Sequence, residues 1–491
     1  MGAAWYAETR GKGLVDARRA GLPSVMDLGS MARARVAVVG AGLSGLMAAR
    51  RLTAAGVSVV VLEARERVGG RTLTHTTARG ERVDLGAQWI GPTQDRVAKL
   101  AGDLGLRTFD QHHAGKKVLS LGGTVTTYKS SIPSLSLIGA VDLGITIQRI
   151  ESLVKEVPAD DPLKARKAAE WDGMTVETWQ RRNIQTRGAR ALLDTAVRAV
   201  FAAEPSELSL LFFLYYLRQG GGLMRLTEIQ NGAQQTRLVE GFQEISKRLA
   251  AELGERVVLG APVRTIRQEE GGCVVVSQRG EVRCERVIVA IPPALSGRIE
   301  YEPELPAARD QLTQRMPMGS VIKCVAFYDA PFWRTAGYSG EALGDSGAVK
   351  LVFDDSPEDG AHGALVGFIM GKDARALTGK PEARRKAAID SFVKYFGPSA
   401  ASPVDYIDQD WPAERWSRGC YAGIMGPGVL SAYSSALRDP VGRVHWAGTE
   451  TARVWVGYME GALEAGERAA GEVLAALGQR SALNPPSGAE Q

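Results

Sequence analysis

The spacing of apolar residues near the N-terminal end predicts a strand, a helix and a second strand in succession. Residues 36–39 are apolar without interruption, as expected of a parallel strand that is covered on both faces. Residues 46–55 carry a helical pattern that Gly56 ends, and a second apolar strand is predicted at 57–62. This order is that of a βαβ unit, which favours an α/β fold.

Later apolar runs predict a region of different character. Strands are expected at 257–266, 273–276 and 287–291, after a helix-rich stretch over 130–250. Within that stretch, residues 208–217 are apolar almost all round, which is typical of a buried helix or of a channel wall. The chain therefore combines an α/β unit with a helical region and further strands.

The two ends do not fit these patterns. Residues 1–30 lack the apolar run of about 7–15 residues that a secretory signal needs, so we expect an appendage in which residues 14–20 could form a docking helix. Residues 481–491 are small and polar and are expected to fray. Since no run of about 18 apolar residues occurs, no membrane-spanning helix is expected.

Composition narrows the class of protein. The chain is 45% hydrophobic and 23% charged over 491 residues, as in a soluble globular protein of two or three domains. Its 57 glycines exceed the usual share of about 7%, which suits tight turns and close backbone–ligand approaches. A net charge of +5 without a dense basic block does not indicate nucleic acid. Four cysteines without a CxxC pair favour a reducing, cytoplasmic location, and five scattered histidines indicate no metal site.

The loop between the first strand and its helix has the glycine spacing of a dinucleotide-binding turn. Gly40 permits the tight turn, Gly42 lets backbone N–H groups reach a pyrophosphate, and Gly45 lets the helix pack on the strand. Ser44 lies in the same loop, and the helix N-terminus attracts the phosphate. Glu63 ends the second strand, where a carboxylate can accept hydrogen bonds from a ribose. This pattern alone does not separate NAD from FAD.

The following segment supplies two cations beside this turn. Gly69 and Gly70 again allow close backbone approach, and Arg65 and Arg71 could neutralise a diphosphate, although such arginines can also be solvated surface charges. Residues 63–72 resemble the second signature of the glutathione-reductase-like FAD proteins. FAD is therefore the expected cofactor.

From about Arg35 to about Leu477 the chain resembles the flavin-dependent monoamine oxidases. The segments that carry this resemblance are 84–94, 203–205, 220–222, 231–234, 318–324, 331–334, 419–421, 447–451 and 457–462. The resemblance implies an α/β, two-domain fold with a Rossmann-like FAD-binding domain and a discontinuous substrate domain that has a mixed sheet and helices. It assigns an N-terminal extension to 1–32, the FAD-binding domain to 33–108, 239–312 and 414–478, the substrate domain to 109–238 and 313–413, and a tail to 479–491.

Three residues are expected to be catalytic. By family likeness, Tyr421 and Tyr458 form an aromatic cage for the amine, although either could be an ordinary core tyrosine. Lys323 lies in the apolar strand 321–327, a poor place for an unpaired ammonium. The resemblance assigns this lysine to a water that bridges to flavin N5, and the alternative is a lysine that snorkels to the surface.

The resemblance also assigns residues to the flavin itself. In the animal monoamine oxidases, a cysteine in a Gly-Cys-Tyr setting carries the flavin as an 8α thioether, and Cys420 stands in that setting here. Arg418 stands where the mammalian pattern has glycine, and Cys420 could instead be a free, buried thiol. The other residues expected to contact FAD by this likeness are Gln88, Val263, Thr449 and Met459.

A set of mostly apolar side chains is expected to line the substrate channel. By sequence alone each apolar member is more commonly a core residue, so this expectation rests on the resemblance. Thr227 and Ala199 stand where the mammalian enzymes carry larger side chains, which predicts a more open channel. The full set is Trp89, Ala199, Val200, Thr227, Gln234, Leu343, Leu351, Phe353 and Phe368.

The resemblance predicts a flavoprotein oxidase of primary amines, in the EC 1.4.3 class. It would convert RCH2NH2, water and dioxygen to an aldehyde, ammonia and hydrogen peroxide, with hydride-equivalent transfer from the amine α carbon to flavin N5. Partners would be the amine and dioxygen, and a homodimer is common in the family. A diamine or polyamine oxidase would need an acid in the channel, for which Asp354 and Asp355 are candidates, although a solvated loop is the plainer interpretation of both. An L-amino acid oxidase, a flavin-dependent desaturase or isomerase of an apolar lipid, and a non-catalytic flavoprotein are the alternatives.

Overall fold

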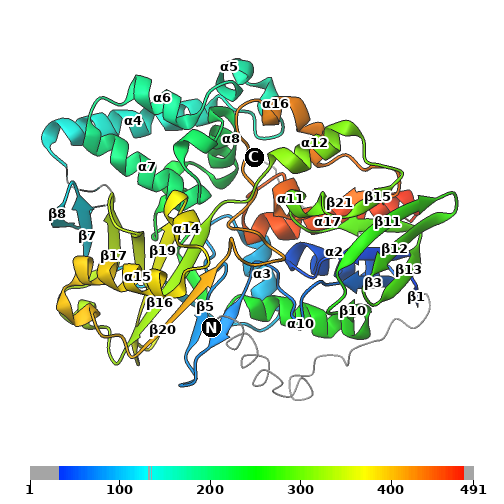
Figure 1. Cartoon of the computed structure of the whole chain (residues 1–491), viewed down its shortest axis with the longest axis horizontal. Coiled ribbons are helices and arrows are strands. Elements are labelled where there is room, and N and C mark those ends of the chain that lie inside the picture. Colours follow the sequence, from blue (N-terminus) through cyan, green and yellow to red (C-terminus); the bar gives the residue numbers. More distant parts are fainter. Residues whose placement is uncertain (1–31, 131–132, 134, 480–491) are drawn as a thin grey trace, which may run out of the picture.

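The computed structural model describes residues 32–130, 133 and 135–479 (Figure 1). Both proposed terminal features, the helix at 14–20 and the tail at 481–491, lie outside the described residues. In the described part the chain forms two lobes, one built on a parallel sheet and the other on a larger mixed sheet.

The first lobe is organised by a five-stranded parallel sheet in the order β10-β3-β2-β14-β21. Every residue of β2 and β3 is buried, so the prediction of a strand covered on both faces is confirmed. The helices α2, α10 and α17 pack on one face of this sheet. The bounds are β2 (Val36–Val39), β3 (Val59–Leu62), β10 (Val257–Val258), β14 (Arg286–Val289), β21 (Val444–Trp446), α2 (Leu43–Ala54), α10 (Gln243–Leu253) and α17 (Met459–Ala476).

A second five-stranded sheet, in the order β1-β13-β12-β11-β15, covers the other face. The strand-rich stretch predicted at 257–266 is confirmed, and the chain there forms β10 in one sheet and β11 in the other. Gly260 turns the backbone with a φ of 61°, and Pro262 has no N–H to donate to a ladder. The bounds are β1 (Ala32–Arg33), β11 (Val263–Glu269), β12 (Gly272–Ser277), β13 (Gly280–Cys284) and β15 (Glu300–Glu302).

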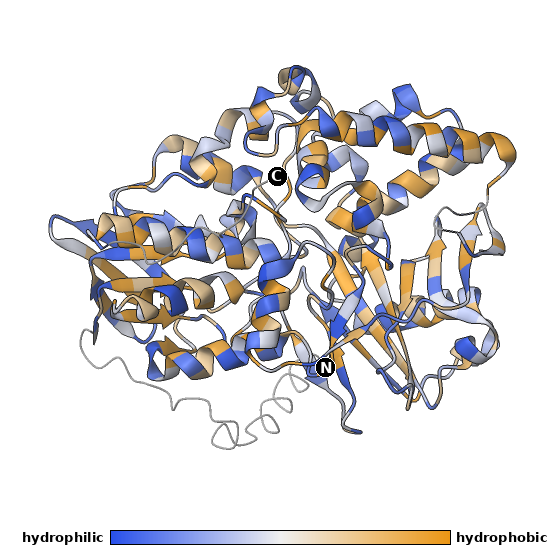
Figure 2. Cartoon of the chain, turned by 180° about the vertical axis from the view of Figure 1, so that it is seen from behind, coloured by the Kyte–Doolittle hydropathy of each residue, from blue (hydrophilic) through white to orange (hydrophobic). Residues whose placement is uncertain are grey.

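The second lobe contains a seven-stranded mixed sheet in the order β20-β16-β19-β18-β17-β7-β8. The helix α7 contacts β17, β18 and β19, whereas α15 contacts β16, β18 and β7. Figure 2 shows apolar strands in both lobes, while the surface helices mix polar and apolar positions. The bounds are β7 (Lys116–Leu121), β8 (Thr124–Tyr128), β16 (Val321–Tyr328), β17 (Tyr338–Gly344), β18 (Val349–Asp354), β19 (Gly363–Met370), β20 (Asp405–Asp410), α4 (Leu137–Lys155), α7 (Arg187–Phe201) and α15 (Pro381–Phe396).

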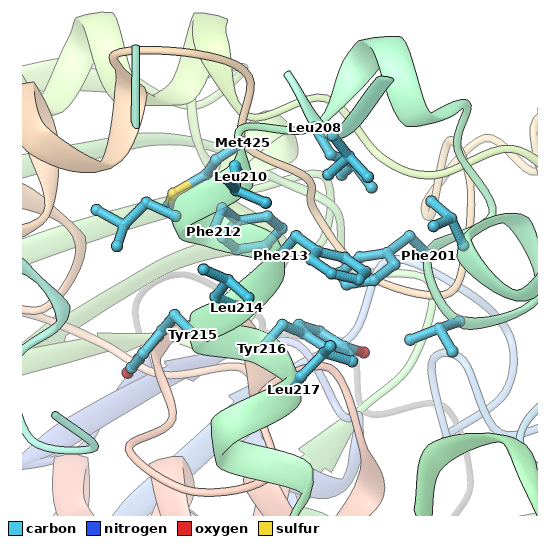
Figure 3. Packing of buried hydrophobic residues seen from close by; sticks show 14 of the residues in the cluster. Phe201, Leu208, Leu210, Phe212, Phe213, Leu214, Tyr215, Tyr216, Leu217 and Met425 are labelled. Atoms are coloured by element: carbon cyan, nitrogen blue, oxygen red, sulfur yellow. The ribbon is translucent and has the colours of Figure 1, made fainter. Parts of the chain in front are cut away.

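The helix α8 (Leu210–Gly220) lies inside the helical layer above this sheet (Figure 3). The Ser209 hydroxyl accepts a hydrogen bond from the backbone N–H of Phe212 at 2.9 Å and caps its start, and Gly221 ends it with a φ of 83°. All of its residues except Arg218 are buried, which confirms the predicted buried helix. No helix among the described residues is both long and apolar enough to span a membrane.

The remaining elements connect these layers. Two small antiparallel pairs are β4 (Thr74–Thr76) with β5 (Arg82–Asp84), and β6 (Thr108–Asp110) with β9 (Thr236–Leu238). The other α-helices are α3 (Asp95–Asp103), α5 (Ala168–Asp172), α6 (Val176–Asn183), α9 (Leu223–Thr227), α11 (Pro293–Ser296), α12 (Ala307–Arg315), α13 (Phe332–Thr335), α14 (Lys372–Leu377) and α16 (Val429–Tyr433).

Candidate active site

A cavity of about 360 Å³ connects the two lobes, within the usual size of a ligand pocket. It begins at the glycine loop that follows β2 and reaches the face of the seven-stranded sheet. Residues from most parts of the chain line it, so the fold brings together segments that are hundreds of positions apart.

The glycine loop has the geometry that a close approach of a ligand requires. Gly40 has a φ of 101°, and a Cβ there would meet Ile291 Cγ2 at 2.8 Å. A Cβ on Gly45 would lie 2.0 Å from the Gly40 carbonyl oxygen, so this glycine serves the packing of α2 and does not line the cavity. Nothing lies within 4 Å of a Cβ at Gly42, and the start of α2 has no side-chain cap. The N–H groups of α2 are therefore available to an anion.

Glu63 lies directly beside this loop and is 3% exposed. Its Oε2 accepts a hydrogen bond from the backbone N–H of Ala41 at 2.8 Å, and its Oε1 accepts one from that of Arg65 at 2.9 Å. The Arg65 Nη2 donates to the Ser417 hydroxyl at 2.8 Å, and its buried Nε has no hydrogen-bond partner. The site thus combines an acceptor for hydroxyl groups with an unused cationic donor.

Arg71 has a carboxylate partner of its own, Glu450. The guanidinium donates to both carboxylate oxygens at 2.6 and 3.0 Å, and to the Tyr421 carbonyl oxygen at 2.9 Å. Burial alone would raise the pKa of Glu450, but attraction and hydrogen bonding by Arg71 hold that pKa below its usual value. Since the charge of Arg71 is already balanced, its contact with a diphosphate stays a prediction.

The two predicted tyrosines both line the cavity at its apolar middle. The Tyr458 ring packs on Trp455 and Tyr216 with centroids 4.9 and 6.0 Å apart, and the Tyr421 ring packs on Phe368 at 6.4 Å. The peptide bond that precedes Tyr421 is cis. Burial raises the pKa of both phenols well above the ordinary value. Both tyrosines therefore stay neutral over the physiological range.

Lys323 also lines the cavity and is 2% exposed, so the alternative of a snorkelling lysine is wrong. Its Nζ donates to the Gly86 carbonyl oxygen at 3.0 Å and to the Gln88 Oε1. Burial lowers the pKa of Lys323 to about 8, against the attraction of Asp355 and Asp84. This ammonium donates hydrogen bonds to two neutral oxygens, and the Gln88 side chain connects it to the Asp355 carboxylate.

Asp355 belongs to this network and not to the channel. Its Oδ1 accepts a hydrogen bond from the Gln88 Nε2 at 3.0 Å and forms an ion pair with the Arg237 Nη2 at 2.8 Å. The neighbouring Asp354 is paired with Arg334 at 2.7 Å. Neither aspartate lines the cavity, so the hypothesis that they hold the second ammonium of a diamine is wrong. Sequence patterns missed the structural role of Asp355 because Gln88 and Arg237 come from distant segments.

Cys420 lines the cavity next to Tyr421 and is 5% exposed. Burial raises the pKa of its thiol to about 12. All four cysteines are free thiols, and no group of three potential metal ligands forms within the described part of the chain.

The nine residues predicted for the substrate channel all line this one cavity. Their apolar members form ring contacts such as that of Trp89 with Phe353, whose centroids are 5.2 Å apart. Thr449 and Met459 line it from the cofactor side, whereas Val263 lies at the start of β11 and does not. The structure thus assembles the predicted set around a single space.

Sequence patterns missed four residues that line the outer end of the cavity. These are Lys117, Tyr128, Glu228 and Glu341. The signal that could have revealed one of them is strand periodicity, since Glu341 lies two positions before the predicted Leu343 and shares its face of β17. Lys117 and Tyr128 carried no such signal, because neither flanks a predicted site residue.

Comparisons with known proteins identify the family of the chain. The model of the family described as flavin containing amine oxidoreductase matches residues 43–474. A probable flavin-containing monoamine oxidase A of Dictyostelium discoideum is 44% identical over 442 residues, covering 89% of this chain and 97% of the relative. The flavin-containing amine oxidase A of Bos taurus is 40% identical, covering 91% of this chain and 86% of the relative.

Solved structures extend this likeness to the fold. Cyclohexylamine oxidase from Brevibacterium oxydans superposes with a TM-score of 0.87 at 34% identity, over 91% of this chain and all of that one. A putrescine oxidase bound to putrescine superposes with a TM-score of 0.86 at 33% identity, over 91% of this chain and all of that one. The chain therefore belongs to the flavin-containing amine oxidase family, as the resemblance of its motifs predicted.

Proposed function

We propose that this amine oxidase acts on primary amines, converting RCH2NH2, water and dioxygen to an aldehyde, ammonia and hydrogen peroxide. The observation that carries the proposal is that Lys323, Tyr421 and Tyr458 line the same cavity as the glycine loop. FAD, which the family implies, supplies the two-electron oxidation of the amine and the return of the electrons to dioxygen when bound.

The residues of the first lobe fit such a cofactor. The glycine loop and the uncapped start of α2 would bind the diphosphate, Glu63 would accept hydrogen bonds from a ribose, and the unpartnered Nε of Arg65 would supply a further donor. Further residues proposed to hold FAD are Gly40, Gly42, Ser44, Gly70, Arg71, Gln88, Thr449 and Met459, all of which line the cavity.

The middle of the cavity is suited to an amine that reacts without its proton. Desolvation between aromatic rings disfavours the ammonium form, and the faces of Tyr421 and Tyr458 attract residual positive charge without binding it as a carboxylate would. Lys323 would hold water beside the cofactor and stabilise the negative charge that develops when dioxygen is reduced.

Cys420 is proposed to bind the flavin covalently through a thioether to its 8α carbon; the S–C bond would replace the thiol S–H bond and one methyl C–H bond, and the two electrons and two protons released would reduce dioxygen to hydrogen peroxide by way of the flavin. The position of Cys420 in the cavity, next to Tyr421, supports the proposal. After acid precipitation the protein should keep its yellow colour, and the tryptic peptide that contains Cys420 should carry the mass of the flavin. A colourless precipitate with an unmodified peptide would leave non-covalent FAD.

The rival activities make different demands on the cavity. An L-amino acid oxidase needs an arginine for the substrate carboxylate, but the arginines among the described lining residues, Arg65 and Arg71, lie at the cofactor end. The test is to add tyramine, L-phenylalanine and other amines anaerobically to the yellow holoprotein. Bleaching by amines, with peroxide formed on admission of air, is expected. Silence toward every amine would favour a desaturase or an isomerase.

The proposed domain division follows the sheets. All strands of the parallel sheet fall within 33–108, 239–312 and 414–478, and all strands of the seven-stranded sheet fall within 109–238 and 313–413. A homodimer and a cytoplasmic location stay predictions from the sequence.

A further inference from the structure

One face of the seven-stranded sheet forms the floor of the cavity from its inner to its outer end. Lys323 on β16 pairs in register with Phe368 on β19, Phe368 pairs with Leu351 on β18, and Leu351 pairs with Leu343 on β17. All four residues line the cavity. Since neighbouring strands lie about 4.8 Å apart, three steps place β17 roughly 14 Å from Lys323.

Charged side chains take over from apolar ones at this outer edge. Glu341 lies two residues before Leu343 on β17 and therefore shares its face. Lys117 lies on the adjacent β7, where Ala342 pairs with Val118, and its Nζ is 3.0 Å from the Glu341 Oε2. Glu228, just after α9, approaches the same ammonium at 3.6 Å. The outer end of the substrate cavity is therefore lined by two carboxylates and one ammonium.

This group has two carboxyl groups for one ammonium group. The Oε1 of Glu341 is buried and has no hydrogen-bond partner, while its Oε2 is taken by Lys117. A buried acceptor without a partner is a cost that a donor entering the cavity would remove. Burial raises the pKa of Glu341 above its ordinary value, and the negative charge of Glu228 acts in the same direction, against the attraction and hydrogen bonding of Lys117 and the attraction of His113. A cation that enters the cavity would find the unpartnered Oε1 of Glu341 beside the apolar side chains of Leu343 and Leu351.

We propose that Glu341 and Glu228 form an outer subsite that binds the second ammonium of a long α,ω-diamine or polyamine. This inference rests on the proposed function, because the first amino group must react at the inner end. The second ammonium would donate to Glu341 and Glu228 while its methylene chain lies along Leu343, Leu351 and Phe368. The length of the floor favours a substrate longer than putrescine.

The test compares diaminodecane with decylamine, which differ by the terminal amino group. For wild-type holoenzyme we expect kcat/KM to be about ten-fold higher for the diamine, well above the factor of two that its two equivalent ends supply. In Glu341→Gln and Glu228→Gln this ratio should fall toward two. In Lys117→Met it should rise, because a competing cation is lost. Glu358→Gln, an exposed loop position, is the matched control and should keep the wild-type ratio.

The outcomes separate the inference from the function on which it rests. A wild-type enzyme that oxidises decylamine but prefers the diamine no more than two-fold overturns the subsite and leaves the amine oxidase intact. A preference that survives both Glu→Gln changes overturns the assignment to these residues. If neither ten-carbon amine is oxidised while tyramine is, the subsite is overturned and the amine oxidase stands, whereas failure to oxidise any primary amine overturns the proposed function itself. Should Glu341→Gln fail to fold, the wild-type ratio and Glu228→Gln still decide.

Discussion

Two lysines on the same side of the seven-stranded sheet have opposite surroundings. Lys323, at the inner end of the cavity, donates to the carbonyl oxygen of Gly86 and the amide oxygen of Gln88. Lys117, at the outer end, contacts the carboxylates of Glu228 and Glu341. A buried ammonium that is bonded only to neutral oxygens has a lowered pKa, whereas the charge of an ammonium between carboxylates is neutralised by its partners. Only the inner lysine is therefore suited to respond to charge that develops during a reaction.

The largest effect is expected from removing the inner cation. Lys323→Met should slow the reoxidation of the reduced holoenzyme by dioxygen about 100-fold, because preorganised electrostatic stabilisation of this kind contributes on that order. Stopped-flow mixing of the reduced enzyme with air-saturated buffer measures it. Lys386→Met, on the exposed surface of α15, is the matched control and should reoxidise at the wild-type rate. Equal rates for both variants would remove Lys323 from the reaction.

The same Glu→Gln change should affect stability differently at the two ends. Glu450→Gln leaves the Arg71 guanidinium buried without its charged partner and should lower the free energy of unfolding by about 3 kcal/mol. Glu228→Gln breaks a longer, partly exposed contact and should cost less than about 1 kcal/mol. Urea unfolding of the two variants measures both values, and comparable losses would contradict the contrast.

The next largest effect is expected in the pH dependence of the reoxidation rate, which depends on the protonation of Lys323. Because the pKa of Lys323 is lowered to about 8 in the folded protein, its ammonium is lost as pH rises through that value. The reoxidation rate should therefore fall between about pH 7 and pH 9. Asp355→Asn removes an attraction that raises this pKa and should move the midpoint to lower pH. A midpoint that does not move would mean that Asp355 acts only on structure.

The smallest effect is expected from a substitution in the part of the cavity between its inner and outer ends. Thr227→Ile adds apolar volume to the channel wall and should lower kcat/KM about five-fold for bulky aryl amines. Turnover of a short alkylamine, which does not reach this wall, serves as the internal control. A uniform loss for all amines would indicate misfolding of α9 and not a narrowed channel.

Local patterns predicted the inner end of the cavity better than the outer end. The glycine loop and Glu63 lie within one βαβ unit, so their geometry follows from nearby residues. The lysine in an apolar strand was a conflict visible in the sequence, and the structure resolves it with buried hydrogen-bond acceptors. The tyrosines and the channel residues came from the family resemblance.

The charge pairings could not be predicted, because they join segments far apart in sequence. Arg71 meets Glu450 across 379 positions, and Lys117 meets Glu341 across a strand pairing that only the sheet order defines. Asp355 looked like a channel acid because its own neighbours do not reveal Arg237. The division of the strand-rich stretch 257–266 between two sheets depends on the sheet order, although Gly260 and Pro262 mark its position in the sequence.

The side chain of Gln88 has a consequence for how the inner lysine can behave. A carboxamide accepts at one end and donates at the other, and Asp355 accepts from its donating end. The oxygen must then point at Lys323. In a flipped amide the NH2 group would face the Lys323 ammonium, donor to donor, and the oxygen would face the Asp355 carboxylate, acceptor to acceptor. The Asp355 carboxylate thus fixes the orientation of the Gln88 amide, and Lys323 contacts the partial negative charge of the amide oxygen instead of a full negative charge. A glutamate at this position would lock the proton in place and make the centre insensitive to the chemistry beside it.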